Sequence, residues 1–208
     1  AHLVGAKVIG YTRDMISNVV LYKKVVYNDV NRYHGLYYLD LLEVSKTARA
    51  NYDDLSLDLI VSTTDKLAVE EFIFQNKLTN YVVLVNSGGN NSYEQDGLRM
   101  LPISKMIELV KLLLEQGNKV LLLGAKVDLI HYQKVCGSFP DNHNLYNLAG
   151  KFNLAASSYL IRRAAHFYTT DCGAMHLGVT AGALDRMTAF FGPSNPAHIL
   201  PAQWLSQV

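Results

Sequence analysis

The residues that most clearly suggest a chemical function run from Asp171 to His176, with the sequence Asp-Cys-Gly-Ala-Met-His. It follows a segment at 166–170 that is typical of a strand, and glycine then opens a short helix expected over 173–181. A helix N-terminus offers unpaired N–H groups and partial positive charge, which suit a diphosphate. Asp171 could accept hydrogen bonds from sugar hydroxyls or from the turn's own backbone. His176 lies one turn into the helix, where it could touch a ligand or serve as a core histidine.

Cys172 stands inside this segment, and we expect a small buried thiol there. A nucleophilic role is disfavoured because no His–Asp or His–Asn pattern surrounds it. The other histidines are scattered, and the sequence has neither an H-E-x-x-H nor a C-x-x-C motif. We therefore expect no metal site.

A glycine-containing loop and an arginine form a second candidate site. Ser87, Gly88 and Gly89 follow the apolar run at 81–85, and Arg99 lies shortly before the next helical pattern. Paired glycines let backbone N–H groups approach an anion, and arginine can bind a phosphate through two hydrogen bonds. A plain loop with a solvated arginine explains these residues equally well.

Two further loops carry weaker signals. Asp128 follows the run at 119–124 and could bind ribose hydroxyls, although it could also simply favour a helix N-terminus. The segment from Leu148 to Gly150 could let a flat base lie on the backbone, or it could be an ordinary turn. Neither G-x-x-x-x-G-K-[ST] nor G-x-G-x-x-G occurs, which disfavours a P-loop NTPase or a standard dinucleotide-binding fold.

The elements that must position these residues alternate regularly after residue 80. Strands are expected at 81–85, 119–124, 145–148, 166–170 and 187–191, and helices at 103–114, 127–135, 154–165 and 173–181. Such alternation predicts an α/β fold, a Rossmann-like parallel sheet with helices on both faces. Ligands bind outside the carboxyl ends of such strands, so the candidate loops should meet at one edge of the sheet.

Residues 1–80 are less regular. The patterns predict strands at 7–11 and 57–61, a helix over 31–49, and a helix capped near Thr64 and Asp65. The sequence of residues 14–30 does not indicate which helices or strands they form. These parts do not make a closed domain, and the chain starts without an initiator Met, so we expect a piece of a longer protein.

Composition excludes several classes of protein. The 208 residues carry 19 Lys and Arg against 18 Asp and Glu, and half of them are hydrophobic. A net charge of +1 argues against a non-specific nucleic-acid binder, and the apolar content against a disordered chain. No apolar run approaches the roughly 20 residues that span a bilayer. Two cysteines are too few for a disulfide framework and favour a reducing compartment.

Taken in order, these motifs resemble the ADP-heptose:lipopolysaccharide heptosyltransferases, glycosyltransferase family 9. The matching segments are Leu84-Val85-Asn86-Ser87-Gly88, Arg99-Met100-Leu101-Pro102, Leu122-Leu123-Gly124, Leu148-Ala149-Gly150, Asp171-Cys172-Gly173-Ala174-Met175-His176 and Phe191-Gly192-Pro193-Ser194-Asn195-Pro196. The last two are the most specific. The sequence departs from the family pattern at Cys172, usually Ser or Thr, and at Leu101, usually Trp. Residues 182–184 lack the usual Pro, and the loop between Gly89 and Arg99 is long.

The resemblance implies the donor-binding half of a GT-B glycosyltransferase, whose two Rossmann-like halves face a cleft. Residues 81–208 would be the C-terminal, nucleotide-sugar-binding domain, and residues 1–80 a remnant of the N-terminal acceptor domain with the linker. The C-terminal segment that crosses back to the N-terminal half is expected to be missing or cut short.

Roles in donor binding follow from the same resemblance. Ser87, Gly88, Gly89 and Arg99 would face the donor phosphates. Asp128 would hold the ribose, and the segment from Leu148 to Gly150 would line the base. Asp171 and the helix start at Gly173 would hold the diphosphate and sugar with support from His176, and Cys172 would lie among these donor-binding residues.

The implied reaction transfers a sugar from ADP-heptose or another nucleotide sugar to lipopolysaccharide or another glycan acceptor, without a cofactor or metal. Arg99 and the helix N-terminus would stabilise the leaving diphosphate. The general base is expected in the missing N-terminal half, so this chain alone should bind nucleotide weakly and transfer no sugar. The resemblance also implies a cytoplasmic location with peripheral contact to the inner membrane. No nucleic-acid partner is expected. The alternatives are a degenerate nucleotide-binding module and a nucleotide-sugar epimerase of GT-B-like fold.

Overall fold

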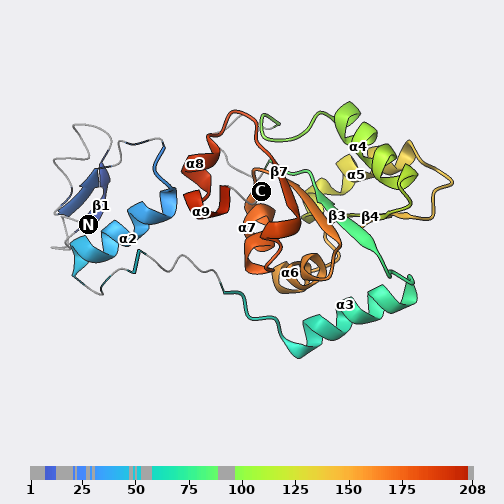
Figure 1. Cartoon of the computed structure of the whole chain (residues 1–208), viewed down its shortest axis with the longest axis horizontal. Coiled ribbons are helices and arrows are strands. Elements are labelled where there is room, and N and C mark those ends of the chain that lie inside the picture. Colours follow the sequence, from blue (N-terminus) through green and yellow to red (C-terminus); the bar gives the residue numbers. More distant parts are fainter. Residues whose placement is uncertain are drawn as a thin grey trace. The chain divides into compact units, whose positions relative to one another are not determined.

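A computed structural model describes residues 8–12, 21, 23–26, 29, 31–46, 49, 51–52, 58–88 and 97–205. The chain forms two compact units, and each is described here by itself. The first comprises Ala1–Ser56 with Asn195–Ser206, and the second Leu57–Ser194 (Figure 1). The division therefore falls near residue 56, whereas the sequence patterns placed it at residue 80.

The second unit is built on a five-stranded parallel sheet. Its strands are β3 (Tyr81–Val85), β4 (Lys119–Leu122), β5 (Leu145–Asn147), β6 (His166–Thr170) and β7 (Met187–Phe190), in the spatial order β5-β4-β3-β6-β7. All five residues of the central strand β3 are buried. A strand covered on both faces must be apolar throughout, which is why β3 shows no alternation. The predicted α/β fold is confirmed.

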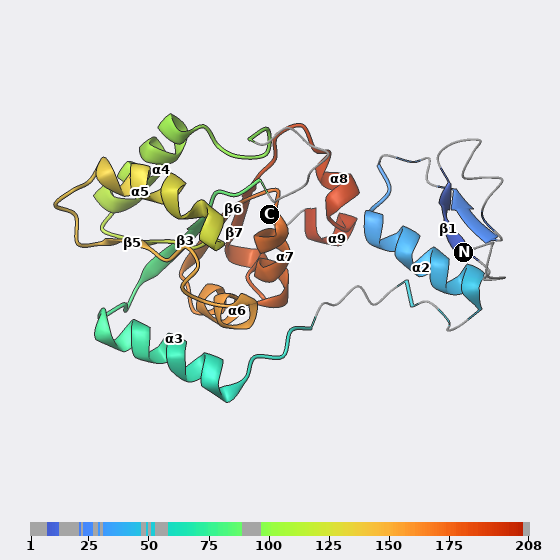
Figure 2. The same ribbon diagram turned by 180° about the vertical axis from the view of Figure 1, so that it is seen from behind.

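Helices cover both faces of this sheet (Figures 1 and 2). They are α3 (Thr63–Gln75), α4 (Ile103–Glu115), α5 (Leu129–Gly137), α6 (Leu154–Arg162) and α7 (Gly173–Thr180), with 3-10 turns η2 (Lys126–Asp128) and η3 (Leu184–Arg186). On one face, α4 and α5 pack with Val82 and Leu84 of β3 in a single apolar cluster. On the other face, the hydroxyl of Tyr81 donates a hydrogen bond to the carbonyl of Leu160 in α6 (2.8 Å). Successive residues of β3 thus serve opposite layers.

The connection into the second unit differs from expectation. Residues 58–61, predicted to be part of a strand, have no regular structure, and Ile60 is 91% exposed. The prediction of a strand was wrong for residues 58–61, because no strand within the described residues pairs with this segment. Helix α3 then begins after Ser62, whose hydroxyl accepts the Asp65 N–H (3.1 Å), so the cap lies before the predicted Thr64.

The first unit contains a parallel strand pair and three helices among the described residues. They are β1 (Ile9–Thr12), β2 (Lys23–Val26), α2 (His34–Ser45), α8 (Pro196–Ile199) and α9 (Ala202–Leu205). The pattern at 7–11 foresaw β1 and that at 31–49 foresaw α2, whereas β2 lies in the span without a defined pattern. The Nδ2 of Asn195 donates a hydrogen bond to Oδ1 of Asn31 (2.8 Å), a few residues before α2 begins. Residues Asn195–Ser206 belong to the first unit, and the expectation that the segment crossing back to the N-terminal half is missing or cut short stays a prediction.

Candidate functional site

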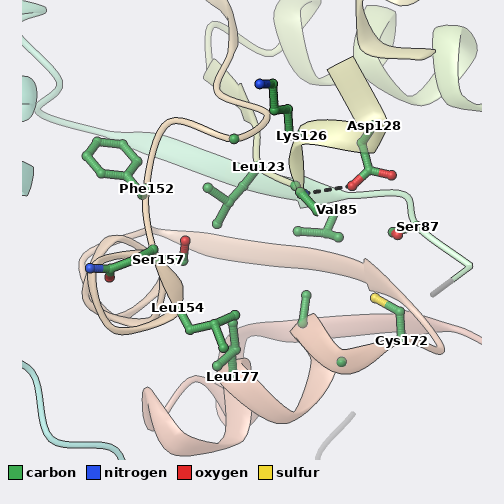
Figure 3. A pocket seen from close by; sticks show the side chains of 16 residues that line it. Val85, Ser87, Leu123, Lys126, Asp128, Phe152, Leu154, Ser157, Cys172 and Leu177 are labelled. Atoms are coloured by element: carbon green, nitrogen blue, oxygen red, sulfur yellow. Dashed lines mark hydrogen bonds between the residues drawn. The ribbon is translucent and has the colours of Figure 1, made fainter. Parts of the chain in front are cut away.

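The order of the strands points to one place for a ligand. From β3 the chain moves to β4 and β5 on one side of the sheet, whereas β6 and β7 lie on the other side. In open α/β sheets, ligands bind beyond the carboxyl ends of the strands where the order reverses in this way. A cavity of about 610 Å³ lies there, and it takes residues from the ends of β3 and β4 and from α6 and α7 (Figure 3).

The cavity has two chemically different ends (Figure 3). Phe152, Leu154 and Leu177 make one end apolar. At the other end lie Ser87, Asp128 and the start of α7. This division suits a ligand with a flat apolar group at one end and hydroxyl or charged groups at the other.

The loop after β3 is fixed to the neighbouring strand β6. The Thr170 hydroxyl donates to the Ser87 carbonyl (2.7 Å), and the Ser87 N–H donates to the same hydroxyl (3.2 Å). Thr170 is fully buried. A Cβ on Gly88 would lie 3.4 Å from Met100 Cγ, so the two described ends of this loop are close together. Gly89, a predicted site residue, lies outside the described residues.

The structure brings Arg99 and Asp171 together, although they are far apart in the sequence. Arg99 Nε lies 3.8 Å from Asp171 Oδ2, and the Arg99 side chain is about a quarter exposed. Asp171 is buried, and its Oδ2 accepts no hydrogen bond from the residues that the structure describes. A buried carboxylate oxygen is costly unless a donor or a cation faces it. The site therefore has a partly exposed arginine beside a buried carboxylate oxygen that accepts no hydrogen bond from the described residues.

Helix α7 starts directly after this carboxylate. Cys172 is its N-cap residue in extended conformation, and its side chain makes no capping hydrogen bond. The first N–H groups of a helix have no partner within the helix. A Cβ on Gly173 would meet no atom within 4 Å, so space remains in front of this helix start. The thiol of Cys172 is buried, as predicted.

Asp128 lines the cavity but is also bonded to its own turn. Its Oδ2 accepts the Ala125 N–H (2.8 Å), and it hydrogen-bonds the Ser87 side chain. Burial raises the pKa of the Asp128 carboxyl, and these hydrogen bonds lower it in part. Gly124 is required here, because a Cβ would lie 2.6 Å from Asp128 Oδ2. Asp128 thus braces two loops, and its binding to ribose stays a prediction.

Of the segment predicted to line a base, only Gly150 reaches the cavity. Gly150 has a φ of +73° and donates its N–H to the Gly124 carbonyl (2.9 Å). Leu148 is buried and is not part of the cavity wall. The apolar wall comes instead from Phe152 and its neighbours, which the sequence motifs did not indicate.

The sequence profile of glycosyltransferase family 9 (heptosyltransferase) matches residues 94–206 of this chain. The chain belongs to this family. It is similar to lipooligosaccharide heptosyltransferase 2 of Haemophilus influenzae, with 32% identity over 97 residues, which cover 45% of this chain and 27% of that protein. The chain thus spans about a quarter of this curated relative.

Solved structures of the family show the same fold. The family 9 glycosyltransferase of Veillonella parvula DSM 2008 superposes with a TM-score of 0.73 at 20% identity, over 96% of this chain and 56% of that chain. ADP-heptose lps heptosyltransferase II of E. coli gives 0.67 at 22% identity, over 95% and 60%. E. coli heptosyltransferase WaaC with ADP gives 0.52 at 18% identity, over 94% and 59%. These likenesses confirm the fold expected from the resemblance.

His176 of this family 9 chain lies in α7 but is not part of the cavity wall. Burial lowers the pKa of its imidazole, and the nearby Asp171 carboxylate opposes this effect in part. The arrangement favours a role in bracing the start of α7, and contact with a ligand stays a prediction.

The lowered pKa predicts acid sensitivity. Below the ordinary histidine pKa of about 6.5, the unfolded chain binds the proton more readily than the folded chain, so His176 destabilises the fold as the pH falls. We expect His176→Gln to flatten the decline in unfolding free energy between pH 6.5 and 5, by at most about 1.4 kcal/mol per pH unit. Urea unfolding across this range would measure it, with the exposed His143→Gln as control. Parallel curves for wild type and His176→Gln would contradict the prediction.

Proposed function

We propose that this chain forms the donor-binding part of a glycosyltransferase that transfers a sugar from a nucleotide diphosphate to a glycan acceptor. ADP-heptose is the proposed donor and lipopolysaccharide the proposed acceptor, within lipopolysaccharide biosynthesis. Family membership supports the reaction class. The observation that carries the site is that the start of α7, at Cys172 and Gly173, lines the cavity, while Asp171 directly before it lies 3.8 Å from Arg99.

The chemistry proposed for these groups is electrostatic. When the bond between the sugar and the diphosphate breaks, negative charge grows on the departing oxygen. A guanidinium and the N–H groups of a helix start can stabilise that charge without reorganising. We therefore propose that the reaction needs no cofactor or metal. The general base is not assigned to this chain, and we expect it in the N-terminal half of the parent protein.

The donor orientation follows from the two ends of the cavity. The base would lie against Phe152 and Leu177, and the diphosphate would lie near Gly173 and Arg99. Asp128 and Ser87 also lie at the polar end, where we propose that they present hydrogen-bonding groups to the ribose. We place the parent enzyme in the cytoplasm, in peripheral contact with the inner membrane where its glycolipid acceptor is embedded.

Calorimetric titration of ADP into this chain tests the proposal, with UDP and GDP as comparisons. We expect ADP to bind most tightly. Preference for UDP or GDP would overturn the ADP-sugar assignment and keep the nucleotide site, whereas absence of binding by all three would overturn the site in this chain. Incubation with ADP-heptose and acceptor should show no sugar transfer by the 208 residues alone.

Gly192, in the Phe-Gly-Pro motif, predicts a sensitive position near the phosphate end. A Cβ there would lie 2.4 Å from the Leu98 carbonyl oxygen and 3.6 Å from Arg99 Cα. We expect Gly192→Ala to displace the Leu98–Arg99 backbone and to weaken ADP binding by about tenfold. Because Gly192 is exposed, the melting temperature should change little. Gly137→Ala, where a Cβ meets nothing within 4 Å, is the control, and equal ADP affinity in both variants would contradict the prediction.

A further inference from the structure

Asn86, the first residue after β3, makes a paired contact that no motif indicated. It is fully buried. Its Nδ2 donates to the Leu101 carbonyl (3.0 Å), and its Oδ1 accepts the Leu101 N–H (2.7 Å). One side-chain amide therefore satisfies both backbone groups of one residue, 15 positions along the chain. The contact reproduces the pairing between neighbouring strands in a place where no strand is present.

The Asn86 backbone is itself firmly held. Its N–H donates to the Tyr132 hydroxyl (3.0 Å), which in turn donates to the Leu123 carbonyl at the end of β4 (2.9 Å). Tyr132 is fully buried. On the other side, Ser87 is tied to Thr170 of β6. The hydrogen bonds of Asn86 thus fix Leu101 relative to the ends of β3 and β4.

Leu101 is the fixed point next to Arg99. Two residues of chain span at most about 7 Å, so a shift of Leu101 moves the Arg99 backbone with it. Leu98, on the other side of Arg99, passes close over Gly192. The segment that carries the guanidinium is therefore held from both sides.

We propose that Asn86 is a positioning residue, which holds Arg99 beside Asp171, next to the start of α7 that lines the cavity, through its two hydrogen bonds with Leu101. The inference rests on the proposed function, because Arg99 must face donor phosphates for its position to matter. Asn86 itself is not part of the cavity wall. Only a side chain with adjacent donor and acceptor atoms can bond the N–H and the C=O of Leu101 together, which asparagine does and leucine or aspartate does not.

A double-mutant cycle tests the inference on the whole chain. We expect Asn86→Ala to weaken ADP binding about tenfold, equivalent to ~1.4 kcal/mol, and to leave adenosine binding unchanged. In an Arg99→Ala background, Asn86→Ala should cost nothing further. An equal loss in both backgrounds, or an equal loss for adenosine, would overturn the inference. Asn118→Ala is the matched control, since Asn118 also bonds a backbone carbonyl, that of Leu113, away from the cavity.

A second readout needs no nucleotide. Hydrogen exchange of the Leu101 amide should become faster in Asn86→Ala and stay unchanged in Asn118→Ala. Unchanged exchange in Asn86→Ala would overturn the clamp. If the wild-type chain does not bind ADP, but the Leu101 amide exchanges faster in Asn86→Ala than in wild type, the proposed nucleotide site is overturned. The hydrogen-bonded link between Asn86 and Leu101 is then still supported. If Asn86→Ala does not fold, Asn86→Leu replaces it in both measurements, because it is similar in size and loses both the amide donor and the acceptor.

Discussion

Replacing Arg99 by alanine is expected to weaken ADP binding to this chain by about a hundredfold, because hydrogen bonds between charged groups are among the strongest in proteins. The change also removes the cation that lies 3.8 Å from the buried Asp171 carboxylate. That carboxylate would then repel the diphosphate. Titration calorimetry at constant ionic strength measures the loss.

Two further variants separate charge from geometry. Arg99→Lys keeps the charge but loses the planar pair of donors, so we expect an intermediate loss. Arg162→Ala removes the same charge from the exposed end of α6 and should leave the affinity unchanged. If Arg99→Ala bound ADP as well as Arg162→Ala does, the phosphate role of Arg99 would be wrong.

Gly178→Ala should produce the largest loss of stability. Gly178 lies in the middle of α7, and a Cβ there would lie 2.7 Å from Phe167 Cε1 and 2.8 Å from Met187 Sδ. Both neighbours are buried, so the helix must move away from the sheet. Overpacking of this kind costs about 1–3 kcal/mol, and the better helix propensity of alanine offsets at most about 1 kcal/mol.

Thermal unfolding measures the Gly178 effect. Each kcal/mol lowers the melting temperature of a chain of this size by about 2–4 °C. Gly137→Ala, in α5 with nothing within 4 Å of the new Cβ, should be neutral or slightly stabilising. A Gly178→Ala variant as stable as Gly137→Ala would show that α7 packs against Phe167 less closely than the structure indicates.

The sheet of the second unit could be predicted because its strands carry their own signal. A buried parallel strand is apolar at every position, as at 81–85, and no distant partner is needed to recognise it. The same reasoning fails where burial depends on a partner. Residues 58–61 are also mostly apolar, but no strand in the described part of the chain pairs with them, whereas Lys23–Val26 pairs with β1 despite its two lysines.

Helix α5 begins later than the sequence pattern predicted, because the short turn η2 precedes it. The sequence predicted a helix over 127–135, and the helix exists at Leu129–Gly137, after the turn η2. Val127 lies in that turn and is 75% exposed, and Ile130 is 67% exposed. Tyr132 and Val135 are the buried residues of α5.

The candidate site was predictable as a set of loops but not as a set of contacts. The rule that ligands bind at the carboxyl ends of parallel strands correctly grouped Ser87, Asp128 and Gly173. The proximity of Arg99 to Asp171 and the clamp of Asn86 on Leu101 join residues distant in sequence. No local sequence pattern predicts these contacts, because arginine, aspartate, asparagine and leucine also occur in loops that have no binding role.

The chain passes between its two units at residues 56–57 and again at residues 194–195. The second of these segments begins two residues after Gly192, where a Cβ would lie 2.4 Å from the Leu98 carbonyl oxygen and 3.6 Å from Arg99 Cα. Any side chain at residue 192 would therefore displace the backbone that carries Arg99, which makes glycine at this position a requirement of the arginine loop.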